Sequence, residues 1–380
     1  MSRVRMFAIA ALALAFVGAV QTAPTSAATE LRYGDVVRVA PSTLMIVGRE
    51  LNPAKGEADI ANVILYRLGD TLYVIDSGAT PSFRPFLRKA VSRMRPFRNL
   101  VLINTHGHPD HIGNNDLLMA TPAVRKRHYM SRLDFSLADN YVQESLAAGI
   151  AGITGYIPGF DDPTAQAQDL FELFAPLEQS TDTRRALESL PQRRVRIGRL
   201  RARGWTFGND GVDVLRTGGH THGELVVYFP KTHLLHTADE TISIYPVWPE
   251  SSAARTRQVF VELLAAASAG GARILTEGHT FSVTRGASRI RQRMRALRNG
   301  YDAYDQAVRR LLAEAAPQGA TVAELVDRVP QAPELANAPG GGQSGVLFTA
   351  LQVVKKLQQL HAVVVSGDTR ATARFVLPPS

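Results

Sequence analysis

Four potential metal ligands lie within the six residues of the segment "HGHPDH": His106, His108, Asp110 and His111. Side chains at positions i and i+2 of an extended segment point to the same side, so His106 and His108 can bind one metal ion. One zinc ion cannot take all four groups and still leave a position open for water, whereas two adjacent ions can share them. The crowding therefore predicts a dinuclear hydrolytic site.

Three further candidate ligands follow apolar runs that are typical of strands. His220 comes after "VDVLRTGG", Asp239 after "THLLHTA" and His279 after "RILTEG". A His or Asp between an apolar strand and a turn is what ligands converging at one edge of a sheet look like in sequence. The chain contains no cysteine, so any zinc site must be built from His, Asp and Glu. We expect these three residues to complete the site.

The order of these motifs resembles the metallo-β-lactamase-fold hydrolase superfamily, in particular its glyoxalase II and lactonase-like branch. The family's HxHxDH signature is "HGHPDH" here, and the resemblance runs from about residue 36 to residue 284. It implies an α/β fold, a four-layer αββα sandwich, with two zinc ions per chain and iron or manganese as alternative metals. It also implies a first metal held by His106, His108 and His220, a second held by Asp110, His111 and His279, and Asp239 bridging both.

The same resemblance assigns roles in the reaction. A hydroxide shared by the two metals would be the nucleophile, and Asp110 would orient that water or take up its proton. Asp76 in "YVIDSG" would support the metal loop without binding metal. The sequence departs from the family pattern at His222, Glu224 and His236. Local hydrogen bonding or packing is the favoured interpretation for the two histidines, and an altered support or substrate contact remains open.

The elements that position these residues alternate between strands and helices. Two β-rich runs around Gly69-Asp70 predict a hairpin, residues 81–94 a helix, and residues 100–104 a strand. This alternation favours a layered α/β sheet. Residues 116–190 carry helix-like pieces and predict a helical lid inserted over the site. Tyr156 and Phe160 in the lid, and Trp248 after Asp239, are candidate substrate contacts, although aromatic side chains more often only pack.

The chain divides into three predicted parts. Residues 1–28 are a signal peptide, with positive "MSRVRM", an apolar run of 14 residues and small residues before Ala28. Residues 29–284 form the catalytic domain. Residues 285–380 form a helical, winged-helix-like domain that ends in a hairpin. No other apolar run is long enough to cross a bilayer, so we expect a periplasmic or secreted protein without a membrane partner after cleavage.

The net charge is modest, and its densest part is local. The formal charge is +9, and removing Arg3 and Arg5 with the signal leaves 41 basic and 34 acidic residues, or +7. Six arginines lie within residues 193–203, a pattern typical of a solvated edge strand and, less often, of a surface for anionic partners. This run and the tail are compatible with nucleic acid, but nucleic acid is disfavoured as a partner because an exported protein rarely meets it. The tail is expected to border the substrate pocket or an oligomer interface, such as that of a homodimer.

The leading interpretation is an exported dinuclear zinc hydrolase that acts on a small ester, thioester, lactone or amide. Four alternatives stay open at this point. They are a phosphodiesterase or nuclease of the same fold, a β-lactamase, a mononuclear iron dioxygenase that uses His106, His220 and Asp239, and a binding protein whose metal site has decayed. The last is disfavoured because every ligand position is filled.

Overall fold

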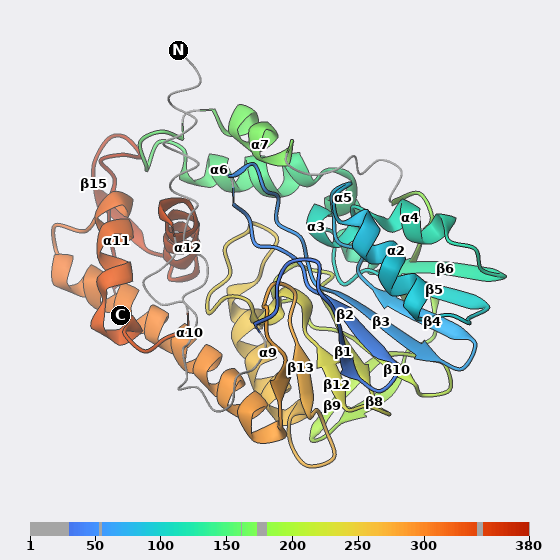
Figure 1. The fold of residues 1–380 in the computed structure, drawn as a ribbon. Coiled ribbons are helices and arrows are strands. Elements are labelled where there is room, and N and C mark those ends of the chain that lie inside the picture. Colours follow the sequence, from blue (N-terminus) through green and yellow to red (C-terminus); the bar gives the residue numbers. More distant parts are fainter. Residues whose placement is uncertain (1–29, 53–54, 161, 173–180, 340–344, 380) are drawn as a thin grey trace.

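The computed structural model describes residues 30–52, 55–160, 162–172, 181–339 and 345–379 (Figure 1). The predicted signal peptide lies outside these residues. Among the helices of the described part of the chain, none combines the length and apolar character needed to cross a membrane.

Two seven-stranded sheets form the centre of the molecule. In the first sheet the strands follow chain order, antiparallel from β1 to β4 and parallel from β4 to β7. Its strands are β1 Val36–Ala40, β2 Thr43–Ile46, β3 Val63–Leu68, β4 Thr71–Ile75, β5 Asn99–Ile103, β6 Arg125–Met130 and β7 Arg184–Ala186. The hairpin predicted around Gly69-Asp70 is β3 and β4, with Gly69 in the left-handed region at φ 57°.

The second sheet contains the later strands in the order β14-β13-β12-β11-β10-β9-β8. They are β8 Arg193–Ile197, β9 Leu200–Phe207, β10 Val212–Arg216, β11 Leu225–Phe229, β12 Leu234–His236, β13 Ile274–Thr276 and β14 Thr284–Arg285. The strand β8 is an edge strand, and Arg193, Arg194 and Arg196 on it are exposed. The prediction that the start of the arginine-rich run is a solvated edge strand is confirmed.

The sheets pack face to face, and helices cover both outer faces. Inward-facing side chains of both sheets share one core, in which the rings of Tyr66 and Phe229 lie 4.9 Å apart. Helix α2, Arg84–Arg93, buries Leu87 and Val91 on the outer face of the first sheet. Helices α9, Ala253–Ala266, and α10, Ala287–Ala315, cover the second (Figure 1). The four-layer αββα sandwich is therefore confirmed, and strands buried on both faces explain the continuous apolar runs.

The helical lid is narrower than the predicted range of 116–190. Strands β6 and β7 fall inside that range, and both belong to the first sheet. The charged start of β6, "RKRHYM", hides its strand character because its first three side chains are exposed. Between these strands the described helices are η2 Arg132–Asp134, α5 Phe135–Asp139, the π-helix η3 Val142–Ala147, α6 Ala148–Ile153 and α7 Pro163–Phe171. Short helices flank this lid, α4 Asn115–Ala120 before β6 and η4 Leu187–Ser189 after β7.

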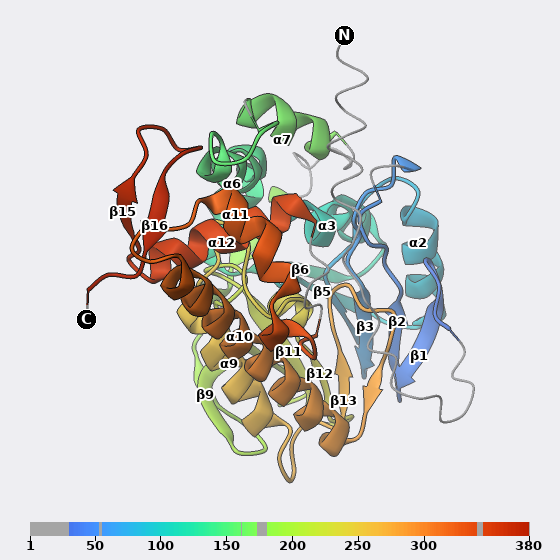
Figure 2. The ribbon, with the colours of Figure 1, turned by 90° about the vertical axis from the view of Figure 1, so that its left-hand side faces the viewer.

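The tail contains the predicted helices and final hairpin. Its elements after α10 are α11 Val322–Arg328, η6 Val329–Gln331, η7 Pro333–Leu335, α12 Val346–Gln359, β15 Val363–Ser366 and β16 Arg374–Val376. Figure 2 shows α12 beside α6 of the lid, and Ile150 of α6 and Leu351 of α12 belong to one apolar cluster with the second sheet. The tail therefore shares a core with the sandwich and the lid. The winged-helix comparison stays a prediction.

Candidate metal centre

The metal loop begins where β5 ends at Ile103 and runs into the short helix α3, Pro109–Ile112. Asp76, at the end of the neighbouring strand β4, fixes its start by accepting hydrogen bonds from Thr105 N at 2.7 Å and Thr105 Oγ1 at 2.8 Å. His108 is extended, and Pro109 starts the helix with a φ already suited to it. The loop therefore presents its ligands from a fixed backbone.

Hydrogen bonds to Asp134 join this loop to the segment that carries His220. The buried carboxylate of Asp134 accepts hydrogen bonds from Thr221 Oγ1 at 2.6 Å, Gly223 N at 2.7 Å and Gly107 N at 3.3 Å. A Cβ at Gly223 would lie 2.6 Å from the Asp134 carboxylate, so glycine is needed for this approach. Asp134 comes from the first turn of the lid, and no local sequence pattern indicated its role.

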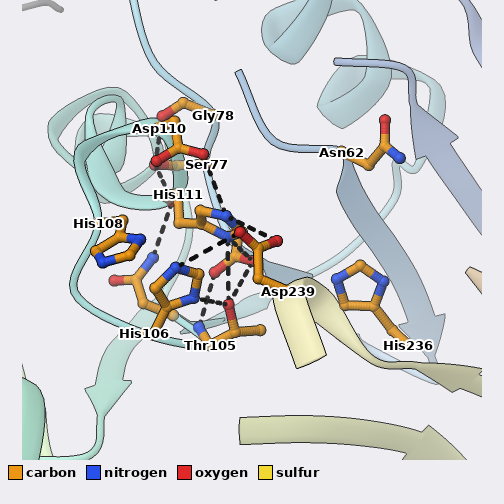
Figure 3. A network of polar contacts seen from close by, with 12 residues as sticks. Asn62, Ser77, Gly78, Thr105, His106, His108, Asp110, His111, His236 and Asp239 are labelled. Atoms are coloured by element: carbon orange, nitrogen blue, oxygen red, sulfur yellow. Dashed lines mark hydrogen bonds and ion pairs between the residues drawn. The ribbon is translucent and has the colours of Figure 1, made fainter. Parts of the chain in front are cut away.

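The structure brings all seven predicted ligands together as two overlapping groups. Figure 3 shows five of them, His106, His108, Asp110, His111 and Asp239. Within each group the ligand atoms all lie within 4.8 Å of one another. The first group is His106, His108, His220 and Asp239, and the second is Asp110, His111, Asp239 and His279. Asp239, just after β12, is the residue the two groups share, as expected for a bridging ligand.

The distances show how closely the second group faces Asp239. His111 Nε2 lies 3.3 Å from Asp239 Oδ1 and 3.2 Å from Asp110 Oδ2. His279 Nε2 lies 3.3 Å from Asp239 Oδ2 and 3.0 Å from Asp110 Oδ2. In the first group His220 Nε2 is 3.6 Å from Asp239 Oδ2 and 3.2 Å from His108 Nδ1. The seven side chains thus converge on one small volume.

Unpartnered polar atoms show that this volume suits metal ions. His106 Nε2, His111 Nε2 and Asp239 Oδ1 are buried and form no hydrogen bond of suitable geometry among the described residues, although His111 Nε2 and Asp239 Oδ1 lie 3.3 Å apart. Leaving such atoms unsatisfied is costly, and a bound cation removes the cost. Nitrogen and oxygen donors in sets of three or four are also what zinc binds. The residues present therefore fit a pair of divalent ions.

The protonation states of His106, His220 and Asp239 agree with this fit. Burial, and then the neighbouring imidazoles, lowers the pKa of His106 well below its usual value, and burial lowers the pKa of His220 to about 4. Burial opposes ionisation of Asp239, but His279 and His111 outweigh it and hold the pKa of this carboxyl well below its usual range. Burial opposes protonation of His111 and His279, but the neighbouring carboxylates, Asp239 for His111 and Asp59 for His279, outweigh it and raise the pKa of both imidazoles. Neutral imidazole and ionised carboxylate are the forms that bind metal.

Four of the histidines turn their other ring nitrogen toward a carboxylate. His108 Nε2 and His111 Nδ1 hydrogen-bond to Glu250 Oε1 at 2.7 Å and Asp76 Oδ2 at 2.8 Å. His106 Nδ1 lies 3.0 Å from Glu224 Oε2, and His279 Nδ1 lies 3.0 Å from Asp59 Oδ1. Such partners fix the orientation and tautomer of metal-binding histidines.

These four carboxylates differ in how far the sequence predicted them. Asp76 lies where the resemblance implied, and Glu224 receives a role that the sequence had left open. Asp59 and Glu250 were missed. Glu250 is 142 residues from His108 and lies in a segment without periodic pattern, so no local signal could have found it.

The other predicted site residues lie in different places. The ring of Trp248 is 6.4 Å from that of His108, so this residue borders the centre. Phe160 is 4% exposed and packs in the apolar cluster shared by lid and tail. Tyr156 lines a cavity of about 220 Å³ with Arg370 and Phe375 of the tail. Phe160 is therefore a packing residue and Tyr156 faces the tail, a tertiary contact that the sequence pattern did not contain.

The remaining departures from the family pattern are local. His222 is exposed, and His236 is buried with Nδ1 3.1 Å from Thr276 Oγ1. Figure 3 shows His236 apart from the imidazoles of His106 and His111. Tyr141 of the lid, for which the sequence predicted no role, lies beside the metal centre: its ring is 5.0 Å from that of His108.

The comparisons with known proteins agree with this geometry. The family model of the metallo-beta-lactamase superfamily matches residues 56–284, more than half of the chain. The chain therefore belongs to the metallo-beta-lactamase superfamily, a group of generally hydrolytic metalloenzymes. No curated protein matches it.

Solved structures share the fold at low sequence identity. A metallo-beta-lactamase family protein from Thermus thermophilus matches with TM-score 0.58 and 16% identity, over 90% of this chain and 100% of that one. A beta-lactamase domain protein from Burkholderia ambifaria matches with TM-score 0.59 and 19% identity, over 94% and 96%. A stereoselective inverting sec-alkylsulfatase from Pseudomonas sp. matches with TM-score 0.50 and 16% identity, over 86% and 50%. At these identities the likeness shows the fold alone.

Proposed function

We propose that this superfamily hydrolase is an exported dinuclear zinc enzyme that cleaves a small ester, thioester, lactone or amide. The observation that carries the proposal is the pair of ligand groups that share Asp239. A mononuclear iron dioxygenase would need only His106, His220 and Asp239, whereas here Asp110, His111 and His279 form a second complete group. Zinc is proposed because the donors are imidazole and carboxylate and because the superfamily is hydrolytic.

The side chains of the centre have different roles in the proposed reaction. Two bound zinc ions would supply a hydroxide at neutral pH and polarise the oxygen of the scissile group. Burial opposes ionisation of Asp110, but His111 and His279 hold its pKa well below the usual range, so it is an acceptor that can orient a water. Tyr141 and Trp248, whose rings lie 5.0 Å and 6.4 Å from that of His108, exclude bulk water and contact the substrate. Burial, and then Asp110, raises the pKa of Tyr141, so its phenol stays protonated.

A small acyl substrate is preferred to nucleic acid because the arginine-rich strand β8 is not adjacent in the sheet to β10, the strand that leads to His220. The strand β9 lies between them. Figure 1 shows β8 at the end of the molecule opposite α3, which follows the metal loop. Export rests on the apolar run and cleavage region of residues 1–28. A homodimer formed through the tail stays a prediction.

The test combines metal content with turnover by the purified mature protein. We expect about two zinc ions per chain and cleavage of one class among a lactone, a thioester, a β-lactam and a bis-phosphodiester chromogen. Asp110→Asn keeps the shape of the side chain but removes its charge, and should lose turnover while staying folded. One iron per chain, or two zinc ions without turnover on any ester, thioester, lactone or amide, would contradict the proposal. Cleavage of the phosphodiester alone would favour the nuclease alternative.

A further inference from the structure

A tight turn carries Glu250 to the metal centre. Ser251 N donates to Trp248 O at 3.1 Å, so residues 248–251 close a four-residue turn with Pro249 in second position. Proline is favoured there because its fixed φ matches the turn. Glu250 occupies the third position, and its Oε1 lies 2.7 Å from His108 Nε2. The turn thus aims this carboxylate at a metal ligand.

The contact with Glu250 fixes which nitrogen of His108 can bind metal. Glu250 Oε1 lies within hydrogen-bond distance of both His108 Nε2, at 2.7 Å, and Ser145 Oγ, at 2.8 Å. An ionised carboxylate only accepts, so His108 Nε2 carries the proton. His108 Nδ1 then keeps its lone pair and faces His220 Nε2 at 3.2 Å. Glu250 therefore orients His108 with the free nitrogen in the first ligand group.

The 248–251 turn is itself held by the tail. Lys355 of α12 donates from Nζ to Ser251 O at 2.6 Å, to Ser251 Oγ at 2.8 Å and to Trp248 O. These acceptors are the two ends of the turn, so one ammonium group closes it. The ring of Phe348, also in α12, packs 5.8 Å from that of Trp248. The helix therefore holds the turn by charge and by apolar contact.

Two further contacts connect the turn to the rest of the site. Ser145 Oγ, in the π-helix of the lid, donates to Glu250 Oε1 at 2.8 Å. Ser252 N, directly after the turn, donates to Gly219 O at 2.8 Å, next to the ligand His220. Glu250 therefore joins the metal loop to the lid, and Lys355 joins both to the tail. A π-bulge at such a place is common at functional sites.

We propose that Glu250 and Lys355 are positioning residues of the metal centre: Lys355 in the tail fixes the 248–251 turn so that Glu250 can orient His108. The tail is then part of the support of the first ligand group. The inference rests on the proposed metal binding but on neither the substrate nor the bond cleaved. Removing an outer partner of this kind weakens metal affinity by about 10–100-fold.

The test compares two neighbouring lysines of α12. Lys355→Met removes the ammonium that closes the turn and keeps the aliphatic stem. Lys356→Met is the matched control, because Lys356 contacts Asp305 and Gln359 and not the turn. Zinc affinity is measured by competition with a chromophoric chelator, and the ligand field by the visible spectrum of the cobalt(II) form. We expect one of two zinc ions to bind about 10–100-fold more weakly in Glu250→Ala. Lys355→Met should lose about 10-fold with a changed cobalt spectrum, and Lys356→Met less than about twofold.

The outcomes are distinct. Unchanged zinc affinity in Glu250→Ala or in Lys355→Met would overturn the proposal. Equal losses in Lys355→Met and Lys356→Met would overturn it too, because general loosening of the tail would then be the cause. Circular dichroism checks folding, and Lys355→Gln replaces Lys355→Met with the same expectation if the latter does not fold. Wild-type protein that binds two zinc ions but cleaves nothing would contradict the proposed reaction and leave this inference standing.

Discussion

The two ligand groups of the metal centre are supported in different ways. In the second group, His111 and His279 face Asp76 and Asp59, which lie directly after β4 and in the segment just before β3 of the first sheet. In the first group, His106 faces Glu224 at the start of β11, but His108 faces Glu250, which the lid and the tail hold. Support of the second group is thus part of the sandwich, whereas half of the support of the first group comes from added segments.

This difference indicates where the centre can be adjusted without disturbing the fold. Asp76 has no exposed surface and fixes both the backbone of Thr105 and the ring of His111. Changing it disturbs the sheet and the loop together. Changing the support of His108 disturbs a turn at the surface of the sandwich. Metal affinity in the first group can therefore vary with the lid and the tail while the core stays the same.

The largest effect is expected for Asp239→Ala, which removes the ligand common to both groups. Both metal sites should weaken by more than the roughly 10–100-fold caused by loss of an outer partner, and turnover should vanish. Metal content after dialysis and chelator competition measure this. If one zinc ion remained bound with wild-type affinity, Asp239 would belong to a single group and the comparison of two overlapping groups would fail.

The next largest effect should separate the two kinds of support. Asp76→Ala leaves His111 without its buried partner, so it should cost about 3–5 kcal/mol of unfolding free energy and weaken the second group. Glu250→Ala should cost only about 1–3 kcal/mol, the range for one buried group left unsatisfied, and weaken the first group. Chemical denaturation of the metal-free proteins gives both values. Equal losses of stability would contradict the distinction between sandwich support and added support.

The sequence revealed the ligands better than their supports, and the reason is physical. His220, Asp239 and His279 each follow an apolar strand, and strand ends at one edge of a sheet must meet, so local pattern predicts convergence. The hairpin of β3 and β4 and the edge strand β8 were predicted by the same kind of local pattern. Glu250 reaches His108 only through the path of the whole chain, and no periodicity encodes that contact.

The lid also shows that local sequence pattern does not predict tertiary contacts. Its helical character was predicted, but of the two proposed substrate contacts Tyr156 faces the tail and Phe160 is buried in an apolar cluster. Tyr141, which lies beside His108, was overlooked. Which face of a short helix meets the metal depends on how the lid packs on α12, and two elements far apart in sequence decide that together.

An effect of intermediate size is expected for the pH dependence of stability at His128, which lies in the hydrogen-bond network behind His111 of the second group. His128 on β6 contacts Asn104 Oδ1 at 2.6 Å through Nε2, and Asn104 Nδ2 donates to His111 O at 3.4 Å. Burial, and then the charge of Arg184, lowers the pKa of His128 to about 3. Below about pH 6.5 the unfolded chain takes up a proton that the native chain refuses. Stability contributed by neutral His128 is therefore full above that pH and is lost as the pH falls toward 3.

This linkage predicts that the unfolding free energy falls with pH below about 6.5, and that replacing His128 removes its share of that fall. His128→Gln cannot titrate, so between pH 6.5 and 3 its unfolding free energy should fall less steeply, by up to about 1.4 kcal/mol per pH unit. Urea titrations of metal-free wild type and variant across this range measure the difference in slope. Parallel curves would mean that His128 is protonated in the native state and is not part of a neutral buried network behind the second group.

The smallest effect is expected at β8, which belongs to neither kind of support. Combined Arg193→Ala, Arg194→Ala and Arg196→Ala should change stability by less than about 0.5 kcal/mol for each substitution, because these side chains are exposed on an edge strand. Zinc affinity of both groups and kcat/KM for a small ester should stay within about twofold. A nuclease would behave differently: cleavage of an oligonucleotide would weaken and its dependence on salt would become shallower, since arginines on phosphates release counterions. Salt-dependent kcat/KM for both substrates therefore decides whether this edge is only a solvated surface or a third region that the site requires.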